Sequence, residues 1–249
     1  MATGEAEWSH RWFHPLPRAR LVERRAFLES VASGKRVIHV GFAGRGEDPG
    51  ASDSWLHARL AACTASLVGV DNDEQGVESA RGQGFEAYVS DCQDPRAVEA
   101  LGLEPAEVVI AAEILEHLDA QGPFLEALRH LVRPDGILVI TTPNAYSLLN
   151  PIATLVGLEM IDPDHVNLHS WYTLQNLLQK GGWTVVESLA YYYRVRGRAP
   201  SFHVAITRGL LMIQRGISQW RPFLGNGLIA VATPGGADGV GSAGQALSS

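Results

Sequence analysis

Residues 107–142 read EVVIAAEILEHLDAQGPFLEALRHLVRPDGILVITT, which is an apolar run, a helical pattern and a second apolar run. The two apolar runs, at 107–113 and 136–142, are rich in β-branched residues, and the segment 121–132 between them has helical spacing. Continuous apolar strands that alternate with helices are typical of a parallel sheet covered on both faces. This stretch therefore predicts one strand–helix–strand unit of an α/β fold.

The same alternation continues in both directions along the chain. Further strands are predicted at 36–41, 66–71, 85–90, 183–189 and 227–233. Helical patterns that end near Gly or Pro lie between them, at 55–63, 74–83 and 171–182. We therefore predict a doubly wound, Rossmann-like α/β fold with seven strands.

Length and composition predict a single folded domain with short extensions. The chain has 249 residues, with 46% hydrophobic and 19% charged, which is ordinary for a globular protein. We expect an N-terminal helical cap over 1–34, with one helix at 18–31, a main domain over 35–233 and a disordered tail over 234–249, because the tail has little to bury.

The sequence shows no sign of export or of a membrane span. No uninterrupted apolar segment of signal-peptide type opens the chain, and no run is long enough to cross a bilayer. The two cysteines, Cys63 and Cys92, are predicted to be reduced thiols. We therefore expect a cytoplasmic protein.

Charge is distributed unevenly. The net charge is -7, yet between Glu187 and Asp238 the chain has six arginines and no acidic residue. The acidic total makes nucleic acid a less favoured partner, although the basic segment keeps it open.

The ends of the first three predicted strands indicate an adenosine ligand. In open α/β sheets ligands bind beyond the carboxyl ends of the strands. The first strand ends in Gly41-Phe42-Ala43-Gly44, where small residues let backbone amides approach a ligand closely. The second ends in Asp71, which can accept hydrogen bonds from both ribose hydroxyls, and the third runs into Ser90-Asp91-Cys92, near a predicted adenine edge.

These strand ends leave two cofactor classes open, a nicotinamide dinucleotide and S-adenosylmethionine. A dehydrogenase is disfavoured because its acidic residue follows the glycine loop by about 20 residues. Asp71 lies farther from Gly41 than that, and the chain has no G-x-G-x-x-G motif.

The run ILEHLDAQGPFLEALRHLVRPDGILVITTPN at 114–144 resembles class I S-adenosylmethionine-dependent methyltransferases. Val132-Arg133-Pro134-Asp135-Gly136 is similar to the turn before their fifth strand, and 182–188 is similar to their sixth strand. The resemblance implies a sheet whose last strand is antiparallel. It also implies a set of S-adenosylmethionine-binding residues, namely Gly41, Phe42, Ala43, Gly44, Asp71, Asn72, Asp91, Cys92 and Ala112.

Two positions depart from that family. His39 stands where an acidic residue is usual, and Ala43 replaces the second glycine of the loop. These departures keep a second reading open, in which the chain is a catalytically silent, methyltransferase-like partner subunit.

The stretch AAEILEHL at 111–118 has two interpretations. If the segment after the strand at 107–113 is a helix, one face of it would carry Glu113, Glu116 and His117. These side chains are either a set of metal ligands or ordinary polar residues on the exposed side of a helix. Together with Asp164-His165 further on, the E-x-x-E-H pattern is similar to small-RNA 3′-terminal 2′-O-methyltransferases, and E-x-x-E-H alone is similar to ubiquinone-biosynthesis O-methyltransferases. This resemblance implies the metal ligands Glu113, Glu116, His117 and His165.

A divalent ion would have a chemical purpose, because a hydroxyl is a poor nucleophile until its pKa is lowered. Such a ligand set suits Mn, Zn, Co or Fe better than Mg. His117, His165 and Glu113 are the predicted catalytic residues, and without a metal His117 or His165 could act as the general base. His169 is predicted to be a lid or packing residue.

The acceptor is predicted only by class. Apolar and basic segments around 145–170 and 190–225 are expected to form a lid over the substrate, and Tyr191, Tyr192, Tyr193, Phe202 and Trp220 with the nearby arginines could hold an anionic or aromatic acceptor. Alternatively, the basic segment is an amphipathic helix with its basic side in water. We favour O-methylation of a small-molecule or saccharide hydroxyl. A lipid-like phenol with contact at a membrane surface, and an RNA 3′-terminal 2′-hydroxyl, remain alternatives.

Overall fold

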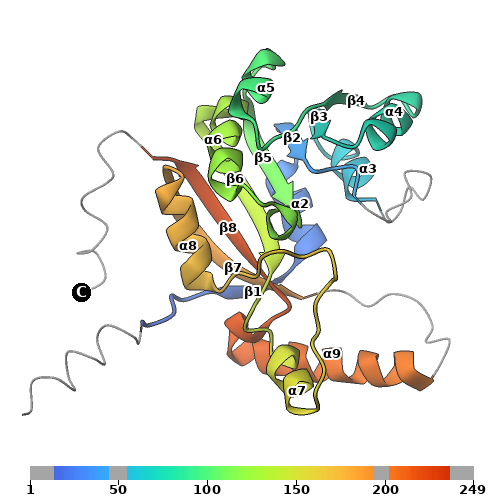
Figure 1. Ribbon diagram of the computed structural model, residues 1–249, viewed down its shortest axis with the longest axis vertical. Helices are drawn as coiled ribbons and strands as arrows, with labels where there is room; N and C mark the ends of the chain where they lie inside the picture. The colour runs from blue at the N-terminus through green and yellow to red at the C-terminus, as the bar shows by residue number, and fades with distance from the viewer. Residues whose placement is uncertain (1–13, 45–54, 193–201, 236–249) are drawn as a thin grey trace, which may run out of the picture.

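A computed structural model describes residues 14–44, 55–192 and 202–235, with the side chains of the last range described from residue 208 onward. Within these residues, eight strands form one sheet in the order β1-β7-β8-β6-β5-β2-β3-β4 (Figure 1). Strand β8 runs antiparallel to both β6 and β7, and the other pairs are parallel. The strands are β1 (Arg20–Glu23), β2 (Arg36–Val40), β3 (Ser66–Asp71), β4 (Glu86–Val89), β5 (Ala106–Ala112), β6 (Val132–Pro143), β7 (Trp183–Tyr192) and β8 (Gly227–Pro234).

Helices cover both faces of the sheet, as the apolar strands predicted. Helices α5, α6 and α8 pack on one face, and α2, α3 and α4 pack on the other (Figure 1). The helices are α2 (Arg24–Ala32), α3 (Leu56–Ala61), α4 (Glu74–Gly82), α5 (Pro95–Ala100), α6 (Gln121–Leu131), α7 (Leu149–Leu155), α8 (Trp171–Lys180) and α9 (Phe202–Trp220), with the 3-10 turns η1 (Leu115–His117) and η2 (Pro222–Leu224).

Strand β2 shows why the central strands are mainly apolar. Alternate side chains of a strand point to opposite faces. Ile38 and Val40 therefore join the core under α5, α6 and α8, whereas Val37 joins the core under α2 and α3. A strand buried on both faces has no position for an exposed polar side chain, so its sequence reads as one apolar run.

The N-terminal segment differs from the prediction of a helix at 18–31. Residues Arg20–Glu23 form β1, an eighth strand that pairs in parallel with β7, and helix α2 begins only at Arg24. The carboxylate of Glu23 ends the strand and caps the helix, since it accepts hydrogen bonds from the backbone amides of Arg25 at 3.3 Å and Ala26 at 2.9 Å. A strand of four residues at a sheet edge is too short for its periodicity to be recognised.

Two insertions form a lobe beyond the carboxyl ends of the strands, which we call the α7–α9 lobe (residues 145–168 and 202–226; Figure 1). The two parts are joined by Gln214, whose side-chain amide donates to Ser147 Oγ at 2.7 Å and to the Leu224 carbonyl at 2.9 Å. Their role as a substrate lid remains a prediction.

Two further expectations concern membranes and the tail. Among the described helices, none combines the length and apolar character that crossing a bilayer requires. Strand β8 reaches Pro234, so the first residue of the predicted disordered tail is ordered in the sheet, and 236–249 lie outside the described residues.

Candidate functional site

A cavity of about 1100 Å³ opens at the carboxyl ends of β2, β3, β4 and β5. Its wall contains eight of the nine predicted cofactor residues and all four predicted metal ligands. The ninth cofactor residue, Ala43, does not line the cavity but shapes it through its backbone. The topology thus brings together strand ends that are far apart in the sequence.

The loop after β2 is held in a conformation that leaves its backbone close to the cavity. Gly41 and Gly44 have positive φ angles of 70° and 45°. A Cβ atom at Gly41 would lie 2.5 Å from the side chain of Ile114, so glycine is required there for both conformation and space. The amide of Ala43 donates to Asp71 Oδ2 at 2.8 Å, which ties the loop to the end of β3.

Asp71 is nearly buried and has two roles in the cavity wall. Besides holding Ala43, it accepts a hydrogen bond from the amide of Asp73 at 3.0 Å through Oδ1. Carboxylate oxygens have further lone pairs, which remain able to accept from ribose hydroxyls. Beside it, the buried Ser90 hydroxyl has no hydrogen-bond partner among the described residues, and burial raises the pKa of Cys92 to about 12, so the thiol stays neutral.

His39, which replaces the usual acidic residue, is buried beside a second histidine that the sequence analysis did not single out. The two Nδ1 atoms of His39 and His57 lie 3.2 Å apart, and the rings stack at 5.4 Å between centroids. Burial lowers the pKa of His57 to about 4, and burial with the charges of His57 and Arg24 lowers the pKa of His39 well below its usual value. Both imidazoles are therefore neutral. This position does not provide the negative charge that an acidic residue would place beneath the glycine loop.

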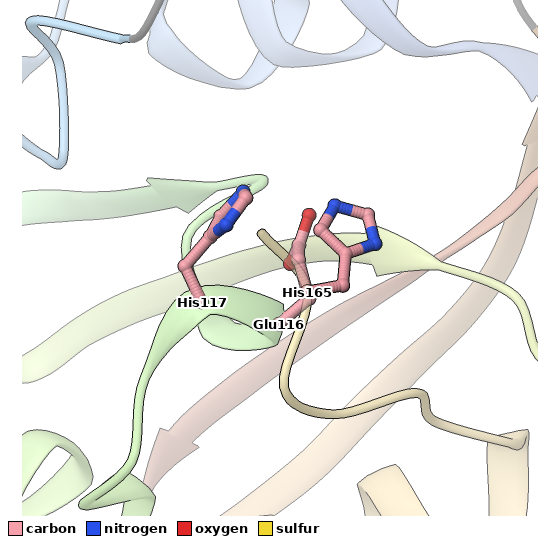
Figure 2. Close-up of side chains that lie close together, drawn as sticks. All are labelled: Glu116, His117 and His165. Atoms are coloured by element: carbon pink, nitrogen blue, oxygen red, sulfur yellow. The ribbon is translucent and has the colours of Figure 1, made fainter. Parts of the chain in front are cut away.

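Three of the four predicted metal ligands form one compact group. Single ligand atoms of Glu116, His117 and His165 all lie within 4.8 Å of one another. Figure 2 shows these three side chains beside one another, Glu116 and His117 from the turn η1 after β5, and His165 from the loop that follows α7. The histidine rings meet edge to face with centroids 4.7 Å apart.

The turn and the loop that carry these side chains are fastened together. The carbonyl of Glu116 accepts from the amides of Val166 at 3.0 Å and Asn167 at 3.1 Å. The side-chain amide of Asn167 donates to the Leu118 carbonyl at 2.9 Å. These three bonds hold the His165 loop against η1. They thereby keep His165 beside Glu116 and His117, although it lies far from them in the sequence.

Burial differs within the group, because Glu116 is buried, His165 is partly buried and His117 is exposed. Glu116 is 1% exposed, and its carboxylate accepts from the hydroxyl of Thr142 at 3.1 Å. Burial and the charge of Glu113 raise the pKa of Glu116 to about 8, and burial with the neighbouring His117 lowers the pKa of His165. The Nδ1 atom of His165 is buried without a hydrogen-bond partner among the described residues.

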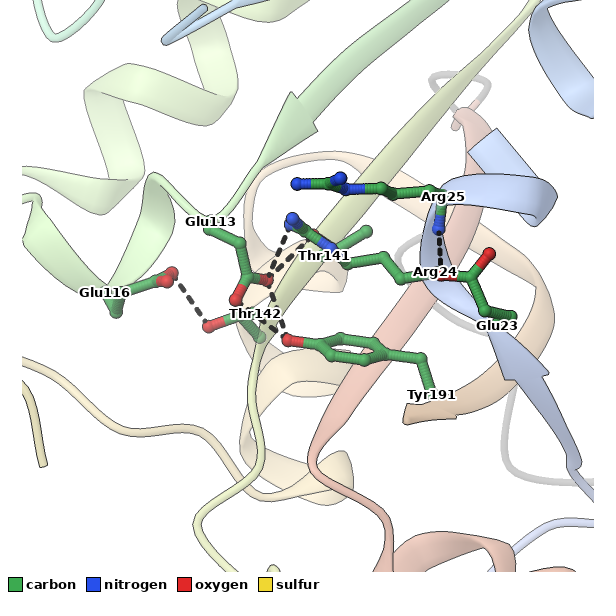
Figure 3. A network of polar contacts seen from close by, with 8 residues as sticks. All are labelled: Glu23, Arg24, Arg25, Glu113, Glu116, Thr141, Thr142 and Tyr191. Atoms are coloured by element: carbon green, nitrogen blue, oxygen red, sulfur yellow. Dashed lines mark hydrogen bonds and ion pairs between the residues drawn. The ribbon is translucent and has the colours of Figure 1, made fainter. Parts of the chain in front are cut away.

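Glu113 stands apart from this group. Its φ angle is 55°, so the chain leaves β5 in a left-handed turn and does not form the helix that would place Glu113, Glu116 and His117 on one face. Its carboxylate accepts from Thr141 Oγ1 at 2.8 Å and from the Tyr191 hydroxyl at 2.9 and 2.8 Å (Figure 3). Arg24 lies 3.6 Å from the same carboxylate.

Two residues that contact Glu113 were not predicted in this position. Arg24 was not identified from the sequence, and Tyr191 was given a different role. Tyr191 is fully buried, so its ring is not available to stack on an acceptor as predicted. Tyr192 is only partly exposed, and the guanidinium carbon of Arg215 lies 4.1 Å from the centroid of its ring. Trp220 is 74% exposed, while Tyr193 lies outside the described residues and Phe202 outside the described side chains.

His169 behaves as predicted for a packing residue. It is 6% exposed, its carbonyl accepts from the Ala145 amide at 2.9 Å, and its ring contacts the Gln121 side chain at 3.0 Å. Neither cysteine is in a disulfide, in agreement with the prediction of free thiols.

Sequence comparison identifies the family. The family described as "Methyltransferase domain" matches residues 17–188, which is more than half of the chain. Among curated proteins, the chain is 28% identical over 160 residues to the ubiquinone biosynthesis O-methyltransferase of Burkholderia orbicola (strain MC0-3), covering 63% of this chain and 67% of that protein.

Solved structures agree on the fold. A S-adenosylmethionine-dependent methyltransferase from Archaeoglobus fulgidus matches with a TM-score of 0.50 and 17% identity, covering 92% of this chain and 99% of that one. The [4+2]-cyclase SpnF matches with a TM-score of 0.54 and 16% identity, covering 86% and 81%. Because a cyclase shares the fold, the fold does not determine the reaction, and the family match carries the assignment. The chain belongs to the methyltransferase-domain family and is a class I S-adenosylmethionine-dependent methyltransferase.

Proposed function

We propose that this methyltransferase transfers the methyl group to a hydroxyl of a small-molecule or saccharide acceptor, with a divalent ion held by Glu116, His117 and His165. One observation carries the proposal: the compact group of these side chains lines the same cavity as Gly41 and Asp71. A cofactor that lies across the strand ends would therefore have its reactive end next to a set of metal-ligating atoms.

The cofactor residues support a defined orientation of S-adenosylmethionine. Asp71 would accept from the ribose, and Asp91 and Cys92 would lie beside the adenine. The loop Gly41–Gly44 would face the methionine portion, which places the sulfonium toward Ala112 and the turn η1. The order of the strand ends around the cavity supports this orientation.

The ligand chemistry fits a divalent ion. Two imidazoles and one carboxylate form a set known from catalytic zinc and non-haem iron sites, which keep coordination positions open. The raised pKa of Glu116 and the Nδ1 of His165, which has no hydrogen-bond partner among the described residues, both fit the binding of a cation here. Mn, Zn, Co or Fe suit these donors better than Mg. A divalent ion bound there would supply Lewis acidity that lowers the pKa of an acceptor hydroxyl.

The chain's own residues would position the acceptor and hold its proton. In protein without a bound metal, His165, whose pKa is lowered by burial and by the neighbouring His117, would be neutral at neutral pH and could accept the proton of the acceptor hydroxyl. As a metal ligand it would use that lone pair for the ion instead. We assign a supporting role to Glu113, which the resemblance implied as a ligand and catalyst, because its carboxylate accepts hydrogen bonds from Tyr191 and Thr141.

The acceptor class rests on two further supports. The curated relatives are named O-methyltransferases. The α7–α9 lobe exposes large apolar side chains beside the loop that carries His165, among them Leu155 at 87%, Val156 at 72% and Leu158 at 64%. Such a surface favours an acceptor with an apolar portion over a polyanion.

Metal analysis and cofactor titration test the proposal together. We expect about one divalent ion in unchelated protein, its loss in His117→Ala and His165→Ala, and its retention in the matched control Glu113→Gln. Equal metal content in all four proteins would reject the metal site, and loss in Glu113→Gln alone would reject the three-ligand assignment. Calorimetric titration with S-adenosylhomocysteine should give heat, and its absence would favour a catalytically silent partner subunit.

The acceptor is tested by mass spectrometry with a deuterium-labelled methyl donor. The panel should hold sugars, phenols, primary amines and a short RNA with a free 3′ end. We expect the label on an oxygen of a sugar or phenol. Label found only on amines, or only on the RNA 3′-terminal ribose, would contradict the proposed acceptor class.

A further inference from the structure

The buried pair His39 and His57 lies at the wall of the cavity, and the proposed function gives it no role. His39 belongs to β2, two residues before Gly41, and is 2% exposed where it lines the cavity. His57 belongs to α3 and is fully buried. The Nδ1 atoms of the two rings lie 3.2 Å apart, so each ring is held in place by the other.

The contact between the two Nδ1 atoms requires one shared proton. A neutral imidazole donates from one ring nitrogen and accepts at the other. The lowered pKa values of His39 and His57 keep a second proton off both rings at neutral pH. Two lone pairs, or two N–H groups, would repel each other at this distance. One Nδ1 therefore donates, and the other accepts.

The surroundings of His57 decide which ring donates. Its Nε2 atom is buried without a hydrogen-bond partner among the described residues. The rings of Phe42, Trp55 and Phe85 pack against it, with centroids 4.4, 5.2 and 5.3 Å from that of His57. In protein interiors an N–H group without a partner is rarer than an acceptor without one. The proton of His57 therefore belongs on Nδ1, which donates to His39.

This arrangement places the proton of His39 on Nε2. Among the described residues, His39 forms a hydrogen bond only with His57, through Nδ1, so Nε2–H remains as a donor. His39 lines the cavity together with Gly41 and Gly44. A ligand that lies along the glycine loop would therefore meet a neutral hydrogen-bond donor where the family usually has a carboxylate.

The charges near His39 favour an anionic group at this donor. Arg24 lines the same cavity, and its charge contributes to the lowered pKa of His39. Although Glu113 lies 3.6 Å from Arg24 and offsets part of that charge, an ammonium group beside His39 would meet both a donor and a like charge. A carboxylate would instead accept a charge-assisted hydrogen bond. The methionine portion of S-adenosylmethionine has one carboxylate.

We propose that His39 donates a hydrogen bond from Nε2 to the methionine carboxylate of S-adenosylmethionine, and that His57 is a positioning residue that holds His39 in the donating tautomer. The inference rests on the cofactor orientation proposed above, in which the loop Gly41–Gly44 faces the methionine portion. It does not depend on the metal or on the acceptor. The departure from the family at His39 would then change how the methionine end is recognised without removing cofactor binding.

Calorimetric titration of the full chain with three ligands tests the role of His39. The ligands are S-adenosylhomocysteine, an analogue that lacks its carboxylate and an analogue that lacks its amino group. His39→Phe should weaken binding of S-adenosylhomocysteine and of the amino-free analogue by about tenfold or more, because a hydrogen bond to a charged group is lost. Binding of the carboxylate-free analogue should change little, and His39→Gln, which keeps a donor, should restore part of the loss.

The role of His57 is tested by His57→Phe, which keeps an aromatic ring in the pocket but removes the donor. This variant should weaken S-adenosylhomocysteine more than the carboxylate-free analogue, whereas loss of packing alone would weaken both equally. Nitrogen-15 NMR of histidine-labelled wild type reads the tautomers without any substitution. We expect Nδ1–H in His57 and Nε2–H in His39, with the His39 signal shifted by S-adenosylhomocysteine but not by the carboxylate-free analogue.

Three results would overturn the inference: the reverse tautomers, equal weakening of all three ligands by His39→Phe, or weakening confined to the ligands that carry the amino group. If the variants do not fold, the NMR result on the wild type decides. A wild type that binds none of the three ligands would reject the proposed cofactor site and this inference with it. A wild type that binds S-adenosylhomocysteine and gives one of the three results would reject only the role of His39.

Discussion

The hydroxyl of Tyr191 lies 2.8 Å from Oε2 and 2.9 Å from Oε1 of Glu113, and this pair joins the ends of β7 and β5 across the carboxyl edge of the sheet. Thr141 donates to the same carboxylate, and Arg24 completes its surroundings (Figure 3). The bonds explain why Glu113 lines the cavity without joining Glu116, His117 and His165. They also stabilise the left-handed turn that Glu113 adopts.

Tyr191→Phe should destabilise the protein by about 1.5–3 kcal/mol, because it removes a buried hydroxyl that donates to a charged acceptor. Thermal or urea unfolding measures the change. Tyr192→Phe is the matched control, since it removes the neighbouring hydroxyl while the ring that carries Arg215 remains. Equal stability of the Tyr191→Phe variant and the wild type would show that the pair contributes little.

Gly227→Ala should destabilise the protein by about 1–3 kcal/mol or more through overpacking. Gly227 is the register partner of Tyr191, and a Cβ atom there would lie 2.0 Å from the Tyr191 ring and 2.1 Å from its hydroxyl oxygen. Gly122→Ala is the control, because that position in α6 has open space and alanine favours a helix. Chemical denaturation should separate the two variants in opposite directions.

Metal-free protein should lose stability as the pH rises from about 4.5 toward 8. The pKa of Glu116 is raised to about 8 by burial and by Glu113, so the folded state holds a proton that the unfolded state has released above its ordinary value of 4.5. This stabilisation is fully present below the unfolded pKa and is gone above the folded one.

Urea unfolding of chelator-treated protein across this pH range measures the effect, with Glu116→Gln as the control that cannot titrate. We compare the free energy of unfolding of the wild type with that of the variant at each pH. The wild type should be less stable relative to the variant at pH 8 than at pH 5. Parallel pH profiles for the two proteins would show that Glu116 titrates normally.

Asn167→Ala should weaken binding of the proposed divalent ion by about 10–100-fold, because supporting groups around metal ligands contribute this much. Its side-chain amide bonds to Leu118 and thereby holds the His165 loop to η1. Calorimetric titration of chelated protein with Zn²⁺ or Mn²⁺ measures the affinity.

Val166→Ala is the matched control for Asn167→Ala, because Val166 contacts Glu116 through its backbone and its side chain is 57% exposed. Equal affinities for Asn167→Ala and Val166→Ala would mean that the side-chain bond does not position His165. A drop in melting temperature for Asn167→Ala alone would point to a general structural role.

The sequence by itself determined the order of the buried elements. Strands such as Ser66–Asp71 and Ala106–Ala112 lie where the apolar runs predicted them, because a strand covered on both faces needs apolar residues at successive positions. It also identified the strand-end residues Gly41 and Asp71, since parallel strands direct their carboxyl ends to one edge of the sheet.

Only the tertiary structure decided which side chains meet. Glu113 and Glu116 are three residues apart, yet they lie in different polar groups because one left-handed residue turns the chain and Tyr191 holds Glu113 from another strand. His165 reaches His117 through hydrogen bonds of a loop that no local pattern predicts. The spacing of apolar residues along one stretch of chain indicates which of its side chains are buried. Contacts between distant segments depend on how those segments pack, which no single stretch of chain encodes.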